Sequence, residues 1–204
     1  TGASPALMGK CAEDGRELVF LTSSGRFLAR VQGTVNGNVL LRRQQYRTAD
    51  DADASLKIAR NMIAAKLFNS RWVLERMIRD HGPRIDAERF RQKSLLLKEA
   101  VSLAAEADSM DTLRGIEGEA ATVYFSVLDE MILREKDTFF FHGRNRRPAL
   151  DCVNAMLNFA YTLMTSMCTS ALESVGLDPY VGMMHTDRPG RPSLALDLVE
   201  EFRA

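Results

Sequence analysis

The first part of the chain alternates apolar and polar positions, as half-buried strands do. Residues 17–21 form a short run rich in β-formers, and residues 26–31 alternate along their whole length. A third short apolar run follows at residues 39–41, and residues 5–10 could form a helical turn before the strands. The turn signals between and after these runs are Ser23, Ser24, Gly25, Gly33, Asn36, Gly37 and Asn38. The pattern predicts a small N-terminal β domain and linker over residues 1–47, with a sheet that is incomplete at its N-terminal end.

After residue 47 the apolar positions recur every three, four or seven residues, which is the helical period. Capping and breaking residues divide this region, with Thr48 or Asp50, Asp108 or Ser109, and Ser193 as candidate N-caps. The predicted helices cover residues 48–80, 87–107, 110–134 and 148–175, and a short last helix begins at Ser193. We therefore predict an α+β fold, in which the small β-strand domain precedes a larger all-α domain over residues 48–204.

Composition narrows the class of protein only slightly. The chain has 204 residues, of which 46% are hydrophobic, so it can bury a core of its own. Its 27 basic and 27 acidic residues cancel, but they are unevenly placed. Residues 42–98 are mainly basic, and residues 106–135 are mainly acidic. A polyanion-binding, metal-using protein needs such neighbouring regions, although ordinary helical proteins have them too.

The sequence contains neither a membrane-spanning run nor an opening signal peptide. Cys11, Cys152 and Cys168 form no C-x-x-C pair, and they are read as free thiols in a reducing compartment, which predicts a cytoplasmic protein. The chain starts at Thr1 and stops just after a helix. We therefore expect it to be a piece of a longer protein, truncated at both ends.

The most informative stretch is residues 176–204. His185 closes an apolar run, a loop stiffened by prolines follows, and an amphipathic helix then carries three acidic residues. On a helix, Asp197 can share a face with Glu200 or with Glu201, so geometry alone does not choose between them. The stretch could supply half of a divalent-metal site, or it could be a surface loop followed by a solvated acidic helix.

A second candidate is Glu117, which lies between Gly115 and Gly118 inside a predicted helix. Each glycine in a helix interior costs about 1 kcal/mol relative to alanine, and this cost is tolerated where something approaches the backbone closely. That neighbour could be a ligand. It could equally be another helix, with Glu117 merely exposed.

Together these residues supply carboxylate, imidazole and carboxylate, a set that suits Mg²⁺ or Mn²⁺. A phosphodiester is the natural substrate for such an ion, because the ion neutralises charge that develops on the phosphoryl group. Basic residues would hold the phosphate backbone. The candidates on the first long helix and on the loop before the fourth are Arg60, Lys66, Arg144, Arg146 and Arg147.

Tyr161 gives the fourth helix a polar face, together with Asn154 and Asn158. This face could be a satisfied network in the core, or it could form the wall of an active site. We regard Tyr161 and Asn154 as candidates for that wall.

Three stretches now resemble a known family, the CRISPR-associated adaptation endonuclease-integrases, or Cas protein one. The first combines G-A-S-P-A-L-M-G at residues 2–9 with G-R-F-L-A-R and with G-N-V-L-L-R-R-Q-Q-Y-R, which ends at Arg47. This stretch is similar to the variant of the family that is found with subtype I-C systems. The second is R-G-I-E-G-E-A-A-x-x-Y-F at residues 114–125. The third is H-x-D-R-P-G-R-P-S-L-A-L-D-L-V-E-E-F-R at residues 185–203.

The resemblance implies a metal site formed by Glu117, His185 and Glu200, with Asp197 secondary, and the family pattern D-L-x-E-x-F-R selects Glu200 over Glu201. It implies a catalytic α-helical domain that inserts spacer DNA into the CRISPR array, by attack of a 3′-hydroxyl on a phosphodiester of the repeat. It also implies a homodimer and a small ferredoxin-like partner, Cas protein two. The alternatives are a non-catalytic helical DNA-binding module and a purely structural dimer.

Overall fold

The computed structural model describes residues 2–16, 18–23, 27–33 and 38–203. Residues 17 and 26, where the two strands were expected to begin, and the predicted turn residues Ser24, Gly25, Asn36 and Gly37 lie outside the described part. Along the described residues the elements are α1 (Pro5–Glu13), β1 (Leu18–Leu21), β2 (Phe27–Val31), α2 (Val39–Asp50), α3 (Ala52–His81), the 3₁₀ turn η1 (Gly82–Arg84), α4 (Ala87–Glu106), α5 (Met110–Phe125), α6 (Leu128–Met131), α7 (Cys152–Ser174) and α8 (Ser193–Glu200). The protein is mostly helical, with two short antiparallel strands.

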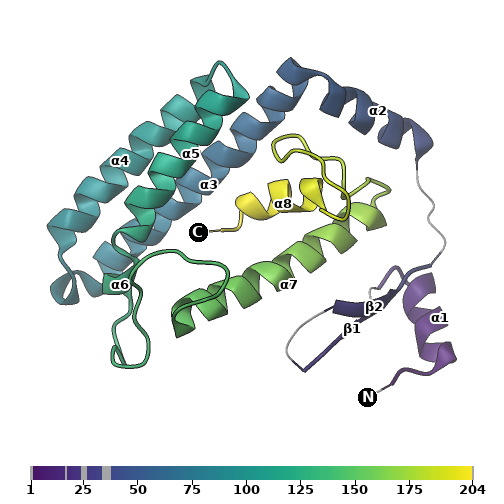
Figure 1. Ribbon diagram of the computed structural model, residues 1–204, viewed down its shortest axis with the longest axis horizontal. Coiled ribbons are helices and arrows are strands. Elements are labelled where there is room, and N and C mark those ends of the chain that lie inside the picture. Colours follow the sequence, from purple (N-terminus) through teal and green to yellow (C-terminus); the bar gives the residue numbers. More distant parts are fainter. Residues whose placement is uncertain (1, 17, 24–26, 34–37, 204) are drawn as a thin grey trace.

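The two predicted strands are confirmed, and they pair with each other as a hairpin. Leu18 lies opposite Val31, and the register shifts by one residue near Leu21. Helix α1 packs beside β2, and Ser4 caps it by accepting a hydrogen bond from the backbone of Leu7. An ion pair between Arg30 and Glu173 joins the hairpin to α7. Figure 1 shows α1 and the hairpin at one end of the molecule, below α7.

The expectation that residues 39–41 extend the β region is wrong, because helix α2 already begins at Val39. The side chain of Asn38 accepts hydrogen bonds from the backbone N–H groups of Leu40 and Leu41, at 3.0 and 3.3 Å. This N-cap satisfies donors that a helix start otherwise leaves unpaired. The helical region therefore starts before residue 47, and α2 runs past that position to Asp50.

Helices α3, α4 and α5 form a layer with a continuous apolar core (Figure 1). The stripe predicted for the first long helix is the face that is buried, and Ile63 and Leu74 are fully covered. Phe90 and Leu97 of α4 meet that face, and Leu113 of α5 closes the core. Burial of side chains of this size contributes roughly 1.5–3 kcal/mol each, so this layer is the main source of stability.

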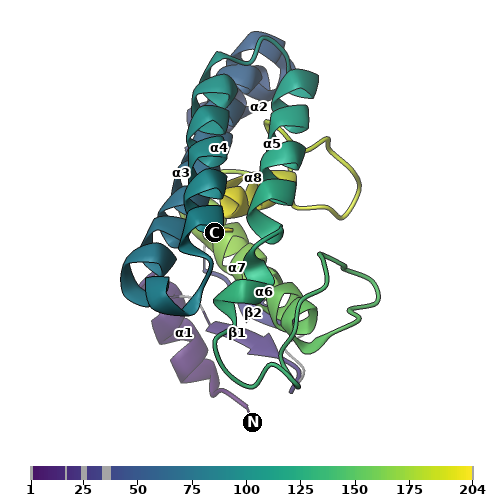
Figure 2. The same ribbon diagram turned by 90° about the vertical axis from the view of Figure 1, so that its left-hand side faces the viewer.

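Helix α8 packs between this layer and α7 (Figure 1). Leu194 and Val199 of α8 pack with Leu172 of α7 in a second, smaller core. On the other side the Asn69 side chain of α3 donates to the backbone oxygen of Glu201, at 2.8 Å. In Figure 2 the green loop after α6 and the yellow loop before α8 project on the same side of the molecule. These two loops carry the arginines and the histidine singled out by the sequence.

Two predicted helices are shorter in the structure than expected. The helix predicted over residues 110–134 ends as α5 at Phe125, and the short α6 follows after Val127 turns into the core. The helix expected to start at Pro148 begins at Cys152, because Asp151 caps it by accepting from the N–H of Asn154 at 2.7 Å. The helix over residues 87–107 is confirmed, as is the cap at Ser109.

None of the helices in the described ranges combines the length and the apolar composition needed to cross a bilayer.

Side chains of α2 hold the connection between α7 and α8, and the buried one among them is Gln45. The amide of Gln45 is buried and donates to the backbone oxygens of Asp178 and Val181, at 2.7 and 3.1 Å. Its oxygen accepts from the N–H of Asp178 at 2.9 Å. Since an unsatisfied buried polar group costs about 1–3 kcal/mol, this amide fixes the path of the chain into the α8 region.

We expect Gln45→Ala to lower the free energy of unfolding by about 2–3 kcal/mol, because three backbone groups lose their partner. Gln44→Ala is the matched control, since Gln44 is exposed and its side chain, within the described ranges, hydrogen-bonds only to Thr48 on its own helix. Urea denaturation of both variants measures the difference. Equal stabilities for the two variants would contradict this role for Gln45.

Candidate active site

Asp197 on α8 organises the turn that carries His185. One of its carboxylate oxygens accepts from the N–H groups of Met183 and Met184, at 2.6 and 3.0 Å. The other accepts from the backbone N–H of His185 at 2.9 Å and bonds its ring Nδ1 at 2.6 Å. The residue is 0% exposed, so all of these bonds are made inside the protein. Asp197 was predicted as a secondary metal residue, and these contacts favour a role in orienting His185 over direct binding of an ion.

The turn closes tightly on α8, and only glycine fits at position 182. A Cβ atom there would lie 2.7 Å from the Cβ of Ser193 and 2.8 Å from the backbone oxygen of His185. With Asp197 ionised, Nδ1 of His185 donates its hydrogen to the carboxylate, which leaves the lone pair on Nε2. This is the tautomer that a histidine needs in order to bind a cation.

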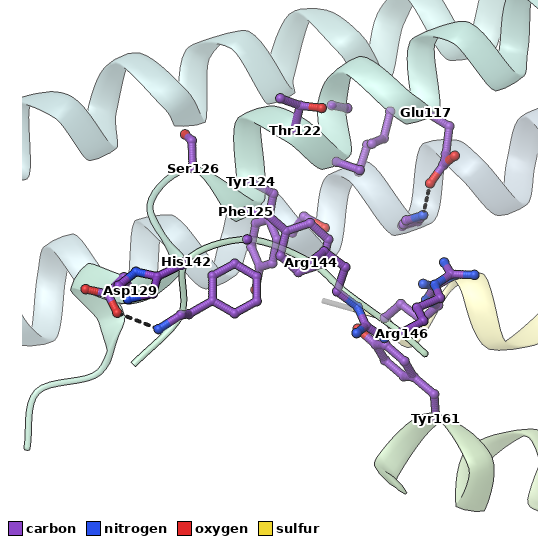
Figure 3. Close-up of a pocket in the computed structure, with 18 residues that line it drawn as sticks. Glu117, Thr122, Tyr124, Phe125, Ser126, Asp129, His142, Arg144, Arg146 and Tyr161 are labelled. Atoms are coloured by element: carbon purple, nitrogen blue, oxygen red, sulfur yellow. Dashed lines mark hydrogen bonds and ion pairs between the residues drawn. The ribbon is translucent and has the colours of Figure 1, made fainter. Parts of the chain in front are cut away.

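Glu117 and Glu200 converge on one positive charge, the ammonium group of Lys66. Lys66 Nζ donates to Oε1 of Glu117 in a short ion pair, and to Oε2 of Glu200 at 2.7 Å. Lys66 is 6% exposed and Glu200 is 4% exposed, whereas the side chain of Glu117 is 25% exposed, so the cluster is buried except on the side of Glu117. Figure 3 shows Glu117 pointing from its helix toward this ammonium group. Lys66 is therefore buried between two carboxylates, and its predicted role in binding DNA stays a prediction.

Arg203 holds the second oxygen of Glu200. Its guanidinium donates to Oε1 of Glu200 in a short ion pair and lies 4.7 Å from the centre of the Tyr161 ring. Burial alone would raise the pKa of the Glu200 carboxyl, but the charges of Lys66 and Arg203 outweigh burial and hold that pKa below its ordinary value. The carboxylate is therefore kept ionised.

A cavity of about 580 Å³ opens beside this cluster (Figure 3). Lys66 and Glu117 line it on one side, and Arg144 and Arg146 line it on the other. Tyr161, which was predicted to form part of the wall of a site, also lines this cavity. Arg147 lines a smaller neighbouring cavity of about 230 Å³. Neither cavity is lined by Arg60, which is half-buried on α3.

The polar face of α7 is divided between a hydrogen-bonded core network and the wall of the cavity. Arg144 donates to the side-chain oxygens of Asn154 and Asn158, at 2.8 and 2.7 Å, and its guanidinium lies over the Tyr161 ring at 5.4 Å. Asn154 is 0% exposed and also binds the backbone of Gly143, so it is a satisfied core group behind the wall. The asparagines hold Arg144 in place, while Tyr161 meets the cavity.

The glycines beside Glu117 leave its helix face open. A Cβ atom built on Gly115 or on Gly118 would meet nothing within 4 Å. The alternative of a glycine-mediated helix crossing is therefore not realised within the part of the chain that the structure describes. Space for a close approach remains on both sides of Glu117.

The predicted metal ligands are only partly brought together. Glu117 and Glu200 share one ammonium group, and Arg114, one turn before Glu117, donates to the backbone oxygen of Met184 at 2.7 Å, next to His185. Yet among the described residues no three His, Cys, Asp or Glu side chains are grouped as they would be around a metal ion. Two carboxylates that already share a positive charge, with an oriented imidazole on the adjoining turn, are a donor set that fits a divalent cation.

Sequence reasoning gave no site role to Lys66 as a partner of carboxylates, and none to Arg203. Both left a signal in the sequence. Lys66 falls between Ile63 and Leu67, in register with the apolar stripe of α3, where a lysine is buried only if it is paired. Arg203 follows Glu200 by three residues, the spacing of a helical ion pair.

The stability of the protein should depend on pH through Glu200. Because its folded pKa lies below its unfolded value of about 4.5, its contribution is present above pH 4.5 and is lost as the pH falls through the folded pKa. In metal-free buffer, Glu200→Gln should cost on the order of 3 kcal/mol at pH 7. The gap to the unchanged protein should narrow between pH 5 and pH 3.

Denaturation curves over this pH range measure the gap, with Glu201→Gln as the neighbouring control. A gap that does not change between pH 7 and pH 3 would show that the charge of Glu200 does not stabilise the fold.

Several known proteins are similar to this chain in sequence or in fold. The CRISPR-associated endonuclease Cas1 1 of Chlorobaculum tepidum is 51% identical over 201 residues, which are 98% of this chain and 59% of that protein. A solved casposase bound to integration product has a TM-score of 0.77 and 26% identity, over 99% of this chain and 54% of the other. A partial Cas6-RT-Cas1–Cas2 complex shares the fold, with a TM-score of 0.75 and 24% identity, over 98% of this chain and 58% of the other.

The chain thus spans about three-fifths of the length of the endonuclease that it matches. Residues 1–204 match the family described as CRISPR associated protein Cas1. The match covers every stretch on which the site rests, from Lys66 on α3 to Arg203 after α8. This chain belongs to the Cas1 family.

Proposed function

We propose that this chain carries the catalytic region of a metal-dependent DNA endonuclease-integrase of CRISPR adaptation. The observation that carries the proposal is the convergence of Glu117 and Glu200 on a single cation beside a cavity lined by arginines. The protein would insert spacer DNA into the CRISPR array, by attack of a 3′-hydroxyl on a phosphodiester of the repeat. The endonuclease name of a relative at 51% identity and the integration product in the casposase structure support this reaction.

The residues of the chain divide the work in this proposal. Glu117 and Glu200 would hold Mg²⁺ or Mn²⁺, with Nε2 of His185 as a third ligand and Asp197 fixing its ring. The ion, when bound, would polarise the phosphoryl group and neutralise the charge that develops on it. Arg203 keeps Glu200 ionised and oriented through its ion pair.

DNA would approach the site through the arginine-lined cavity. Arg144 is held rigidly by two asparagines, and Arg146 is exposed at the same rim, so both can contact successive phosphates. Tyr161, flanked by two guanidinium groups, offers a ring face or a hydroxyl to the bound strand. We also propose contacts from Arg147, Arg60 and Lys66.

The remaining parts of the proposal concern the assembly. We propose a homodimer, a complex with a small ferredoxin-like Cas2 partner, a subtype I-C-like system and a cytoplasmic location. The fold neighbour within a Cas1–Cas2 complex supports the partner. We further propose that the hairpin region and the helices act as two domains, divided near residue 47, and that the intact protein continues beyond the 204 residues.

Glu117→Ala in the intact protein should abolish Mn²⁺-dependent DNA cleavage. Loss of an outer-shell partner already costs roughly 10–100-fold in metal-site activity, so loss of a direct ligand should exceed about 100-fold. Cleavage of a labelled DNA fragment measures the effect, and circular dichroism checks the fold. Glu119→Ala is the control, because Glu119 is exposed on the same helix. Cleavage that survives in Glu117→Ala would refute the assignment.

A non-catalytic helical DNA-binding module is the second candidate, and the exposed arginines of the 144–147 loop favour it. Such a module would bind DNA with a steep salt dependence and without any response to a chelator. DNA binding measured with and without EDTA, beside the cleavage assay, separates the two functions. Salt-dependent binding with no metal-dependent cleavage would support the module over the enzyme.

A further inference from the structure

Lys66 occupies the point where the two predicted metal-binding carboxylates meet. Its ammonium group contacts Oε1 of Glu117 and Oε2 of Glu200, and the side chain is almost fully buried. Glu117 makes no other ion pair among the described residues, whereas Glu200 also pairs with Arg203. The lysine is therefore the one charge that links the carboxylate of α5 to the carboxylate of α8 within the described part of the chain.

A divalent cation and this ammonium group would compete for the same oxygens. Both are positively charged, and at contact distance in a poorly hydrated site their repulsion is strong. An ion that binds between Glu117 and Glu200 therefore has to replace Lys66 there. The displaced charge needs a new place, and the cavity of about 580 Å³ that Lys66 lines provides one.

The two cations at Glu200 differ in how easily they can leave. Arg203 is held on two sides, by Glu200 and by the Tyr161 ring. Lysine is a compact charge on a flexible four-carbon stem, and among the described residues Lys66 Nζ hydrogen-bonds only to Glu117 and Glu200. When Lys66 leaves, Arg203 still neutralises Glu200, and the incoming divalent ion compensates the charge of Glu117.

We propose that Lys66 is a resident cation, which holds Glu117 and Glu200 together before metal binding and which a divalent ion displaces into the adjoining cavity. This inference rests on the proposed function, because it takes Glu117 and Glu200 as metal ligands. In the displaced position the ammonium group faces the space between Glu117 and the arginines. There it is placed to contact a phosphate of bound DNA, so one lysine serves the site in both states.

The first test uses the intact, unchanged protein. Acetylation of lysines by an amine-reactive ester is followed by mass spectrometry, in EDTA and at saturating Mn²⁺. Lys66 should be protected in EDTA, and its acetylation rate should rise about tenfold with Mn²⁺, because displacement moves the amine into the open cavity. Lys57 is exposed on the same helix and should react equally in both conditions. A rate for Lys66 that stays the same or falls would overturn the proposal.

The second test removes the competitor. Lys66→Met keeps the length of the stem and removes the charge, so Mn²⁺ should bind at least about tenfold more tightly, as measured by electron paramagnetic resonance of free Mn²⁺. Lys57→Met removes one charge away from the site and should leave the affinity unchanged. Equal or weaker binding by Lys66→Met would show that the lysine supports the metal site and does not compete for it.

The two tests separate this inference from the proposed function. If the unchanged protein binds Mn²⁺, and Glu117→Gln abolishes that binding while Lys66 stays protected, the metal site stands and only the displacement is refuted. If no Mn²⁺ binds to the unchanged protein, the proposed metal site fails and the inference fails with it. Should Lys66→Met not fold, the acetylation experiment alone decides.

Discussion

Three helices from distant parts of the chain meet at one ammonium group. Lys66 on α3 contacts Glu117 on α5 and Glu200 on α8. Lys66 and Glu200 are buried, whereas the side chain of Glu117 is 25% exposed at the cavity. Removing one partner from a buried ion pair typically costs 3–5 kcal/mol, because the other charge is left without compensation. The cluster therefore fixes the position of α8 against the α3–α5 layer, and this position creates both the cavity and the pair of carboxylates.

The rest of the site depends on how α8 is reached. Gln45 secures the loop after α7, and the buried carboxylate of Asp197 gathers three backbone N–H groups of the turn at residues 183–185. The same carboxylate sets the His185 ring. Helix α8 thus carries both the candidate ligand Glu200 and Asp197, which orients the candidate ligand His185. On the opposite wall, buried Asn154 performs the equivalent task for Arg144, which faces the cavity.

Much of this arrangement could be predicted from local patterns. Three confirmed predictions depend on residues that are close together in the sequence: the apolar stripe of α3, the Ser109 cap and the hairpin. The prediction that residues 39–41 belong to the β region failed, because three apolar residues do not distinguish a strand from the first turn of a helix. The Asn38 cap starts helix α2 there. The premature end of α5 depends on Val127, whose burial is a property of the packed core.

Contacts across the chain were harder to predict. Glu117 and Glu200 were selected by their types and by a family resemblance, but no spacing rule says that Lys66 joins them over separations of 51 and 134 residues. Asn154 and Tyr161 share a helix face. The sequence does not show that the loop with Arg144 covers this face, so that Asn154 becomes a buried core group and Tyr161 becomes part of the cavity wall. Sequence reasoning finds groups with suitable chemistry, whereas the tertiary fold decides which of them meet.

In our proposal, Glu117 and Glu200 form one cation site, which Lys66 fills when no metal is bound. A crystal structure of the intact protein soaked in Mn²⁺, with anomalous data, would show which cation occupies the site. We expect a single strong anomalous peak between the two carboxylates, with the Lys66 ammonium moved into the cavity. A peak elsewhere, or a lysine that still bridges Glu117 and Glu200 at saturating Mn²⁺, would contradict it.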